Sequence, residues 1–231
     1  MRFKGKVVLV LGGTGHIGSA IALAFKKEGA RVCQHGRSGK YAADLKSAKD
    51  VDVLVTQVLS DFKQVDILIN AASHPVKINS FDKKDWSDFN DHFQVQFGGG
   101  LKVIQGVLSG LKTSGSGRII NIITSYIVGQ PPSGLADYIS AKYALLGLTK
   151  VLAKELGKYK ITVNAVSPSL IKNSFSGDVP EKLLDLSIAQ TPLNRLAVAE
   201  DVVGVVLFLA SKEADYITGQ NIIVAGGNVM S

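Results

Sequence analysis

The chain has 231 residues and a net charge of +7, and its 26 Lys and Arg residues are scattered in ones and twos without an arginine-rich run. This distribution argues against a nucleic-acid partner and indicates a solvated surface with a local site for an anionic cofactor. Cys33 is the only cysteine, so we expect neither an internal disulfide nor a metal site built on thiols.

The first apolar stretch bears on location. It covers only five residues before Gly12, too few for a signal sequence or a membrane span, so we expect a cytoplasmic protein without a membrane partner. No Pro/Ser-rich linker, charge block or internal repeat interrupts the chain. We therefore predict a single domain over residues 1–231.

Short apolar runs and segments with helical spacing alternate along the whole chain. The predicted strands are Lys6–Leu11, Arg31–Gln34, Tyr41–Leu45, Asp66–Asn70, Arg118–Ile123, Ile161–Val166 and Asn221–Val224. The predicted helices are Ile17–Glu28, Val51–Phe62, Trp86–Leu111 with a soft interior at Gly98-Gly99-Gly100, Tyr138–Gly157 and Asp201–Ala210. This alternation predicts an α/β fold: a single-domain, doubly wound, Rossmann-type sheet of seven mostly parallel strands with helices on both faces.

One connection fits this fold poorly. Between the strand ending near His35 and the strand beginning near Tyr41 there are too few residues for a crossover helix, which usually needs about a dozen. Either a bare extended return replaces the helix, or one of the two strands is misplaced.

A glycine-rich turn, Gly12-Gly13-Thr14-Gly15-His16-Ile17-Gly18, lies between the first predicted strand and the first predicted helix. Glycines let a backbone approach a pyrophosphate closely, and a helix N-terminus offers unpaired N–H groups to it. We therefore predict a dinucleotide site, and its candidate residues in this turn are Gly12, Thr14, Gly15, His16, Ile17 and Gly18.

The end of the second strand bears on the choice of cofactor. A protein that binds the non-phosphorylated dinucleotide usually carries an acid here for the ribose hydroxyls, whereas this chain reads Gln34-His35-Gly36-Arg37-Ser38. Arg37, helped by Ser38 and Lys40, could pair with a 2′-phosphate, which favours NADP(H) over NAD(H). Asp44 is a candidate for the adenine side.

Tyr138 and Lys142 lie four residues apart on one predicted helix, downstream of the glycine turn. Together with Asp66-Ile67-Leu68-Ile69-Asn70-Ala71-Ala72, Ser125, Ile161–Pro168 and Pro192–Gly227, they make the chain resemble a short-chain dehydrogenase/reductase over almost its full length. The order and spacing of these segments make a chance match improbable. The resemblance implies an oxidoreductase that interconverts a carbonyl and an alcohol.

The resemblance also implies roles for individual residues. Tyr138 would be the acid/base, Lys142 would bond the nicotinamide ribose, and Ser125 would hold the substrate oxygen. Counting along the strand from Asn121 selects Thr124 in place of Ser125; we prefer Ser125, which lies thirteen residues before Tyr138. The remaining implied cofactor contacts are Asn70, Ala71, Pro168 and Ile171.

Chemistry explains why a Lys should lie close to a Tyr that transfers a proton. A free phenol, with a pKa of about 10, is a sluggish proton donor and a rare base near neutrality. A Lys ammonium about 5 Å away would favour the phenolate by roughly 3 kcal/mol at an effective dielectric near 20, which lowers the phenol pKa by about two units. We therefore expect Lys142 to lower the pKa of Tyr138.

Some positions depart from the family pattern. Gln96 stands where the family usually has an Asn that anchors a water for proton relay, so we expect an altered relay through Gln96. Ser73 and Ser169 also differ from the glycines usual there. These departures leave an alternative open, a non-catalytic NADP(H)-binding sensor or scaffold.

Two further expectations concern partners. The segment Asn173–Gln190 is short and mixes apolar residues with few charges, which favours a small or moderately apolar carbonyl substrate. The helix Tyr138–Gly157 carries more apolar surface than one sheet face needs, and relatives in this family pair through such helices. We therefore expect a homodimer or homotetramer.

Overall fold

The computed structural model describes residues 1–171 and 181–230, and in this part of the chain seven parallel strands form one sheet in the order β3-β2-β1-β4-β5-β6-β7. The strands are β1 (Val7–Leu11), β2 (Arg31–Gly36), β3 (Tyr41–Ala42), β4 (Ile67–Asn70), β5 (Arg118–Ile122), β6 (Thr162–Pro168) and β7 (Asn221–Val224). The order reverses between β1 and β4, as in doubly wound folds. The predicted Rossmann-type sheet is confirmed.

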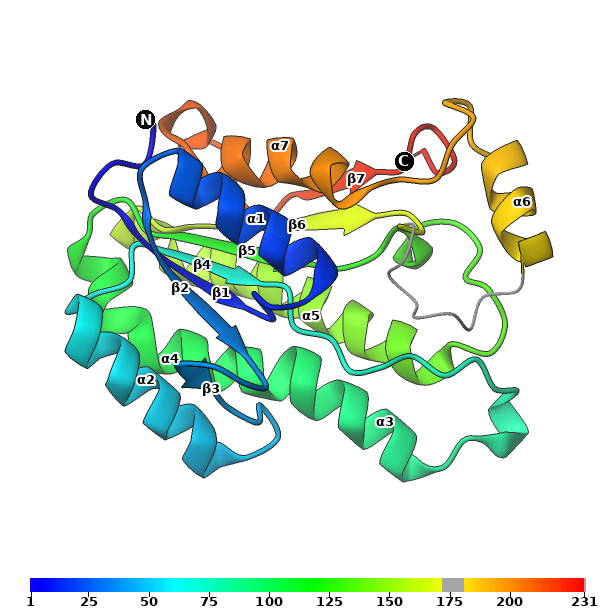
Figure 1. Cartoon of the computed structure of the whole chain (residues 1–231), viewed down its shortest axis with the longest axis horizontal. Helices are drawn as coiled ribbons and strands as arrows, with labels where there is room; N and C mark the ends of the chain where they lie inside the picture. The colour runs from blue at the N-terminus through cyan, green and yellow to red at the C-terminus, as the bar shows by residue number, and fades with distance from the viewer. Residues whose placement is uncertain (172–180, 231) are drawn as a thin grey trace.

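Helices cover both faces of this sheet (Figure 1). On one side lie α1 (His16–Lys27) and α7 (Ala199–Ala210), and on the other lie α2 (Ala48–Phe62), α4 (Gly99–Thr113) and α5 (Ala136–Leu156). Alternate residues of β1 point to opposite faces: Val8 and Val10 pack with the first layer, and Leu9 and Leu11 with the second. Because both faces are covered, the strands are apolar throughout.

The short connection between β2 and β3 is a bare extended return. His35 pairs with Tyr41 and Gly36 with Ala42, in parallel register and without an intervening helix. The strand predicted over Tyr41–Leu45 has only two residues, because after Ala42 the chain turns toward α2. Ser47 caps α2 by accepting a hydrogen bond from the Asp50 N–H.

The helix predicted over Trp86–Leu111 has three parts. These are α3 (Trp86–His92), a π-helical stretch (Phe93–Gly98) and α4. The glycines near the junction permit close packing: a Cβ at Gly100 would lie 2.5 Å from Asn70 Nδ2. Such π-helical stretches occur often at functional sites, and this one carries Gln96.

The segment expected to cover the substrate is only partly described. Of Asn173–Gln190, residues 173–180 lie outside the described residues, and a further helix, α6 (Glu181–Ala189), follows them. Among the helices that are described, none has the length and apolar character needed to cross a membrane.

Candidate active site

A cavity of about 1230 Å³ opens at the carboxyl ends of the strands, from the glycine turn to α5. Most of the predicted cofactor residues line it: Gly12, Thr14, Gly15, His16, Ile17, Gly18, Arg37, Ser38, Asp44, Ala71, Tyr138, Lys142, Pro168 and Ile171. Within residues 1–171 and 181–230 there is no group of three or more His, Cys, Asp or Glu side chains placed to hold a metal ion. The site therefore has the position expected for a dinucleotide in a doubly wound fold.

The glycine turn fits a phosphate. Gly12 has φ +67°, a conformation that favours glycine, and a Cβ there would lie 2.6 Å from the Ala71 carbonyl oxygen. Helix α1 has Gly15 as its N-cap, no side-chain cap and no acid in its first turn. Its first N–H groups and positive dipole end are thus available to an anion at the cavity wall.

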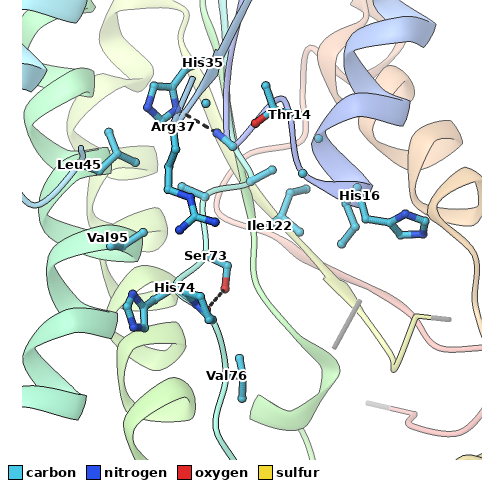
Figure 2. A pocket seen from close by; sticks show the side chains of 18 of the residues that line it. Thr14, His16, His35, Arg37, Leu45, Ser73, His74, Val76, Val95 and Ile122 are labelled. Carbon is cyan, nitrogen blue, oxygen red and sulfur yellow. Dashed lines mark hydrogen bonds between the residues drawn. The ribbon is translucent and has the colours of Figure 1, made fainter. Parts of the chain in front are cut away.

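His35, which the sequence did not single out, supports this turn from behind. The Gly12 N–H donates to His35 Nδ1 at 3.1 Å, so the ring proton is on Nε2 and donates to the Ala43 carbonyl at 3.2 Å (Figure 2). Burial lowers the pKa of His35, which keeps the ring neutral. The imidazole therefore ties the glycine turn to the segment that follows β3.

Arg37 and Ser38 are exposed residues on the cavity wall, and the Arg37 guanidinium points toward Ser73 and His74 (Figure 2). Lys40, expected to help Arg37, instead forms an ion pair with Asp61 at 2.9 Å and does not line the cavity. Lys46 does line the cavity, and its ammonium lies 3.0 Å from Asp91. Directly after β2, where a ribose-binding acid would otherwise stand, the chain thus presents the Arg37 guanidinium.

Tyr138 and Lys142 lie one turn apart on α5, both buried and both on the cavity wall. The Lys142 Nζ lies 5.6 Å from the centre of the Tyr138 ring and donates to the Ile122 carbonyl at 2.9 Å. The Tyr138 hydroxyl is in hydrogen-bonding contact with the Thr124 side chain. The phenol, the amine and a second hydroxyl therefore meet at one end of the cavity.

The structure separates Thr124 from Ser125, the residue that we preferred. Thr124 lines the cavity, whereas Ser125 does not and is 1% exposed. The Ser125 hydroxyl is buried and makes no hydrogen bond within residues 1–171 and 181–230. The reason is local: Thr124 is an extended N-cap, and the 3₁₀ turn that begins at Ser125 directs the next side chain elsewhere. The geometry therefore favours Thr124 at the position that we gave to Ser125.

The pKa of Tyr138 moves opposite to our expectation. Burial raises it and outweighs the hydrogen bond from Thr124, which stabilises the phenolate. Burial also lowers the pKa of Lys142 to about 7, so the amine is only partly charged at neutral pH. A lowered phenol pKa needs a fully charged ammonium in a polar setting, whereas both groups are almost completely desolvated.

Asn70 and Gln96 lie behind the wall and do not line the cavity. The Asn70 amide donates to the Gln96 carbonyl at 3.1 Å, which joins the end of β4 to the π-helical stretch. The Gln96 side chain is fully buried, and its Nε2 lies 2.7 Å from His92 Nδ1. Its Oε1 has no hydrogen-bond partner among the described residues. The Asn70 side chain thus holds the backbone of the π-helical stretch and does not itself face the cavity.

Comparisons with known proteins agree with this geometry. A family model described as enoyl-(acyl carrier protein) reductase matches residues 13–228. The chain is 32% identical to a 3-oxoacyl-[acyl-carrier-protein] reductase of Thermotoga maritima, with 100% of both chains covered. It is 33% identical to a 3alpha-hydroxysteroid dehydrogenase of Mediterraneibacter gnavus, with 98% of both covered.

Among solved structures, a gluconate 5-dehydrogenase from Burkholderia cenocepacia in complex with NADP and tartrate matches with a TM-score of 0.92. The match covers 98% of this chain and 96% of that chain at 23% identity, and at this identity it speaks for the fold. The family model and the curated relatives go further, because they cover nearly the whole chain. The chain belongs to the short-chain dehydrogenase/reductase family of oxidoreductases, which act on CH–OH and C=O groups.

Proposed function

We propose that this protein is an NADP(H)-dependent oxidoreductase that interconverts a carbonyl and an alcohol, with Tyr138 as the acid/base. The observation that carries the proposal is the meeting of Tyr138, Lys142 and Thr124 at one end of the cavity, with the glycine turn further along the same wall. When bound in this cavity, NADPH supplies the hydride that reduces the carbonyl carbon.

The residues of the chain have distinct roles in this proposal. Thr124 holds the substrate oxygen by donating a hydrogen bond, and Tyr138 donates the proton that this oxygen gains. The pKa of Tyr138, raised by burial, keeps the phenol protonated before the reaction. Lys142 bonds the nicotinamide ribose, and once it is protonated its charge stabilises the phenolate that is left.

The cofactor preference rests on Arg37. Its guanidinium lies on the wall at the adenosine end and matches the geometry of a 2′-phosphate. The complex of the gluconate 5-dehydrogenase with NADP supports the same choice. Ser38 is a second donor beside Arg37, and the first turn of α1 receives the pyrophosphate.

Gln96 remains our candidate for proton supply. Its buried Oε1, which has no partner among the described residues, can accept a hydrogen bond from a water. The substrate is a small or moderately apolar carbonyl compound, since the wall near Tyr138 includes Val76, Ile123 and Tyr126. The names of the relatives, an acyl-chain reductase and a steroid dehydrogenase, also denote largely apolar substrates.

We also propose that two copies pair through α5. Tyr143 and Val151 on this helix are 49% and 53% exposed, large values for side chains of this type. Either a homodimer or a homotetramer would bury these exposed side chains between copies. Light scattering of the purified protein distinguishes these two states from a monomer.

The test of the function is turnover. Purified protein is incubated with NADPH and a panel containing 3-oxoacyl thioesters, ketosteroids and small ketones, and NADPH loss is followed by absorbance. We expect turnover by the wild type and a loss of at least about 100-fold in Tyr138→Phe, which keeps the ring but lacks the proton. Equal turnover by both proteins would show that Tyr138 is not the acid/base. Tight NADPH binding without turnover of any substrate would favour the sensor or scaffold.

A further inference from the structure

A buried array of charged side chains lies directly behind the Tyr138 turn. Asp137, one residue before Tyr138, accepts a hydrogen bond from the Tyr138 N–H at 2.9 Å through Oδ1. Its other oxygen, Oδ2, accepts from Lys84 Nζ at 2.7 Å and lies 3.6 Å from His92 Nε2. The side chains of these three residues are only 1–3% exposed. A carboxylate, an ammonium and an imidazole thus meet out of contact with water.

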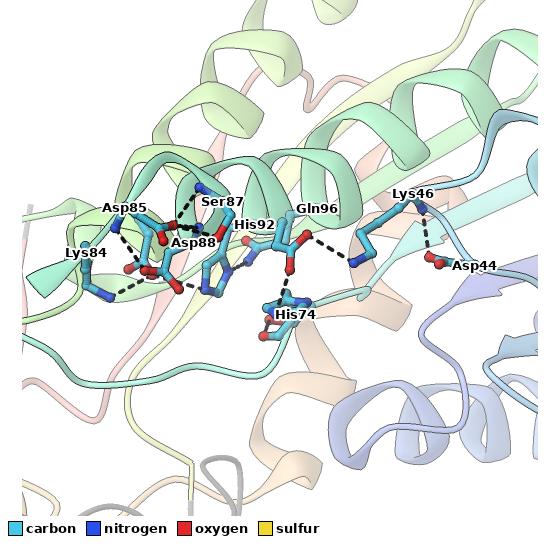
Figure 3. A network of polar contacts seen from close by, with 12 residues as sticks. Asp44, Lys46, His74, Lys84, Asp85, Ser87, Asp88, His92 and Gln96 are labelled. Carbon is cyan, nitrogen blue, oxygen red and sulfur yellow. Dashed lines mark hydrogen bonds and ion pairs between the residues drawn. The ribbon is translucent and has the colours of Figure 1, made fainter.

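His92 extends the array to the phenol ring itself. Its ring meets the Tyr138 ring edge-on, with centres 5.8 Å apart and planes at 75°. On the other side, Gln96 Nε2 lies 2.7 Å from His92 Nδ1, and Figure 3 shows His92 between Lys84 and Gln96. With Gln96 as donor, the His92 proton is on Nε2 and faces Asp137. Asp137 therefore holds the backbone of Tyr138, and His92 packs against its ring.

Lys84 joins this turn to the cavity wall. Besides Asp137, its ammonium donates to the Lys77 carbonyl at 3.1 Å. Lys77 directly follows residues 73–76, which line the cavity. One ammonium thus connects the start of α5 with the segment that borders the space next to the phenol.

The burial of a charged pair, Asp137 and Lys84, in place of apolar side chains needs a physical reason. Burying an ion pair carries a large desolvation cost for each ion, and well-packed apolar residues often stabilise a fold equally well or better. What a fixed carboxylate and ammonium provide is direction, because their hydrogen bonds hold only in one geometry. In catalysis, direction has a large effect: a displacement of about 1 Å can reduce a rate by about 100-fold.

We propose that Asp137, Lys84 and His92 are positioning residues that fix the Tyr138 phenol relative to residues 73–76. This proposal rests on the proposed function, since it assigns Tyr138 the role of proton donor. None of these three residues lines the cavity, so the array acts on the reaction by positioning Tyr138. Its loss lowers the rate of the chemical step and leaves NADPH binding unchanged.

The test compares Asp137→Asn and Lys84→Met with a matched control. Asp215→Asn is the control, because Asp215 pairs with the buried Arg118 at the start of β5, at the opposite end of that strand from Thr124. We expect kcat to fall at least about 10-fold in the two array variants, with KM for NADPH within about two-fold of wild type. The double variant should lose no more than the worse single variant, because both changes break the same array. Asp215→Asn should keep the wild-type kcat.

Hydrogen–deuterium exchange provides a readout that needs no turnover. The backbone amides of residues 136–139 should exchange faster in Lys84→Met than in wild type or Asp215→Asn. If wild type is active and the array variants keep its kcat, the positioning role is wrong while the proposed function stands. If wild type reduces no carbonyl, the proposed function fails, and unchanged exchange at 136–139 would then overturn the array as well.

Discussion

Replacing Thr124 by Val tests which hydroxyl serves the substrate. Val keeps the branched shape of Thr and removes only the hydroxyl, which lines the cavity and contacts Tyr138. The matched change is Ser125→Ala, which removes the neighbouring hydroxyl that lies off the cavity wall. The two variants therefore differ by one position in the chain and by the presence of the hydroxyl at the site.

The magnitude follows from the hydrogen bonds that are lost. Thr124 would donate to an oxygen that becomes negative as the hydride arrives, and a donor of this kind is worth about 2–4 kcal/mol, or about 30- to 1000-fold in kcat. It also accepts from the Tyr126 N–H at 3.3 Å, a long bond whose loss costs about 1 kcal/mol of stability. Ser125→Ala removes a buried hydroxyl without a partner among the described residues, so stability should stay the same or rise slightly.

The assay is steady-state reduction with NADPH, with thermal unfolding of each variant measured alongside. We expect Thr124→Val to lose at least about 30-fold in kcat and Ser125→Ala to stay within about two-fold of wild type. The reverse ranking, with Ser125→Ala the slower enzyme, would refute the assignment of Thr124 and restore the thirteen-residue interval as the better guide.

Two further predictions concern NADPH binding and the stability of the fold at acidic pH. Arg37→Ala should weaken NADPH binding by about 10- to 100-fold, since a charge-assisted contact is worth about 1.5–3 kcal/mol, and should leave NADH binding unchanged. Binding is measured by fluorescence titration, with Lys40→Ala as the control because the Lys40 ammonium pairs with Asp61. Unchanged NADPH affinity in Arg37→Ala would contradict the 2′-phosphate assignment. Burial lowers the pKa of His92 to about 4, opposed by Asp137, so the stability that neutral His92 provides is present above about pH 6.5 and is lost as pH falls toward about 4. Urea unfolding should show a loss of up to about 3 kcal/mol over this range that is absent in His92→Gln, and parallel curves for both proteins would contradict it.

The sequence predicted the fold well where apolar pattern and glycine chemistry act locally. Fully buried parallel strands must be apolar throughout, so runs such as Val7–Leu11 stand out, and each strand of the sheet was found. The π-helical stretch Phe93–Gly98 was missed: its Gln96 carbonyl accepts a hydrogen bond from Asn70, 26 residues away, and a contact between such distant positions leaves no local pattern in the sequence. The helix Glu181–Ala189 was not predicted either, since its pattern of apolar residues is weak.

In the site, spacing along one helix was the most reliable guide. Tyr138 and Lys142 meet because residues four apart share a helix face. The choice between Thr124 and Ser125 could not be made in this way, because side chains at consecutive positions after a strand point in different directions. Lys84 and Asp137 are 53 residues apart, and only the folded chain brings them together. The spacing of four between His92 and Gln96 was a signal that could have been found.

The environment of Tyr138 and Lys142 makes them a coupled pair. Burial raises the pKa of the phenol and lowers that of the amine to about 7, so that between about pH 7 and 10 both groups are neutral. When Tyr138 donates its proton, negative charge is left on a phenolate whose ring centre lies 5.6 Å from Lys142 Nζ, and an ammonium at about that separation stabilises it by roughly 3 kcal/mol at an effective dielectric near 20. Loss of the proton by Tyr138 therefore favours gain of a proton by Lys142. Because both groups are desolvated and neutral, Tyr138 is a protonated donor before the carbonyl is reduced, and Lys142 becomes a charged partner of the phenolate afterwards. An exposed Tyr and Lys at the same spacing would not change their charges together in this way.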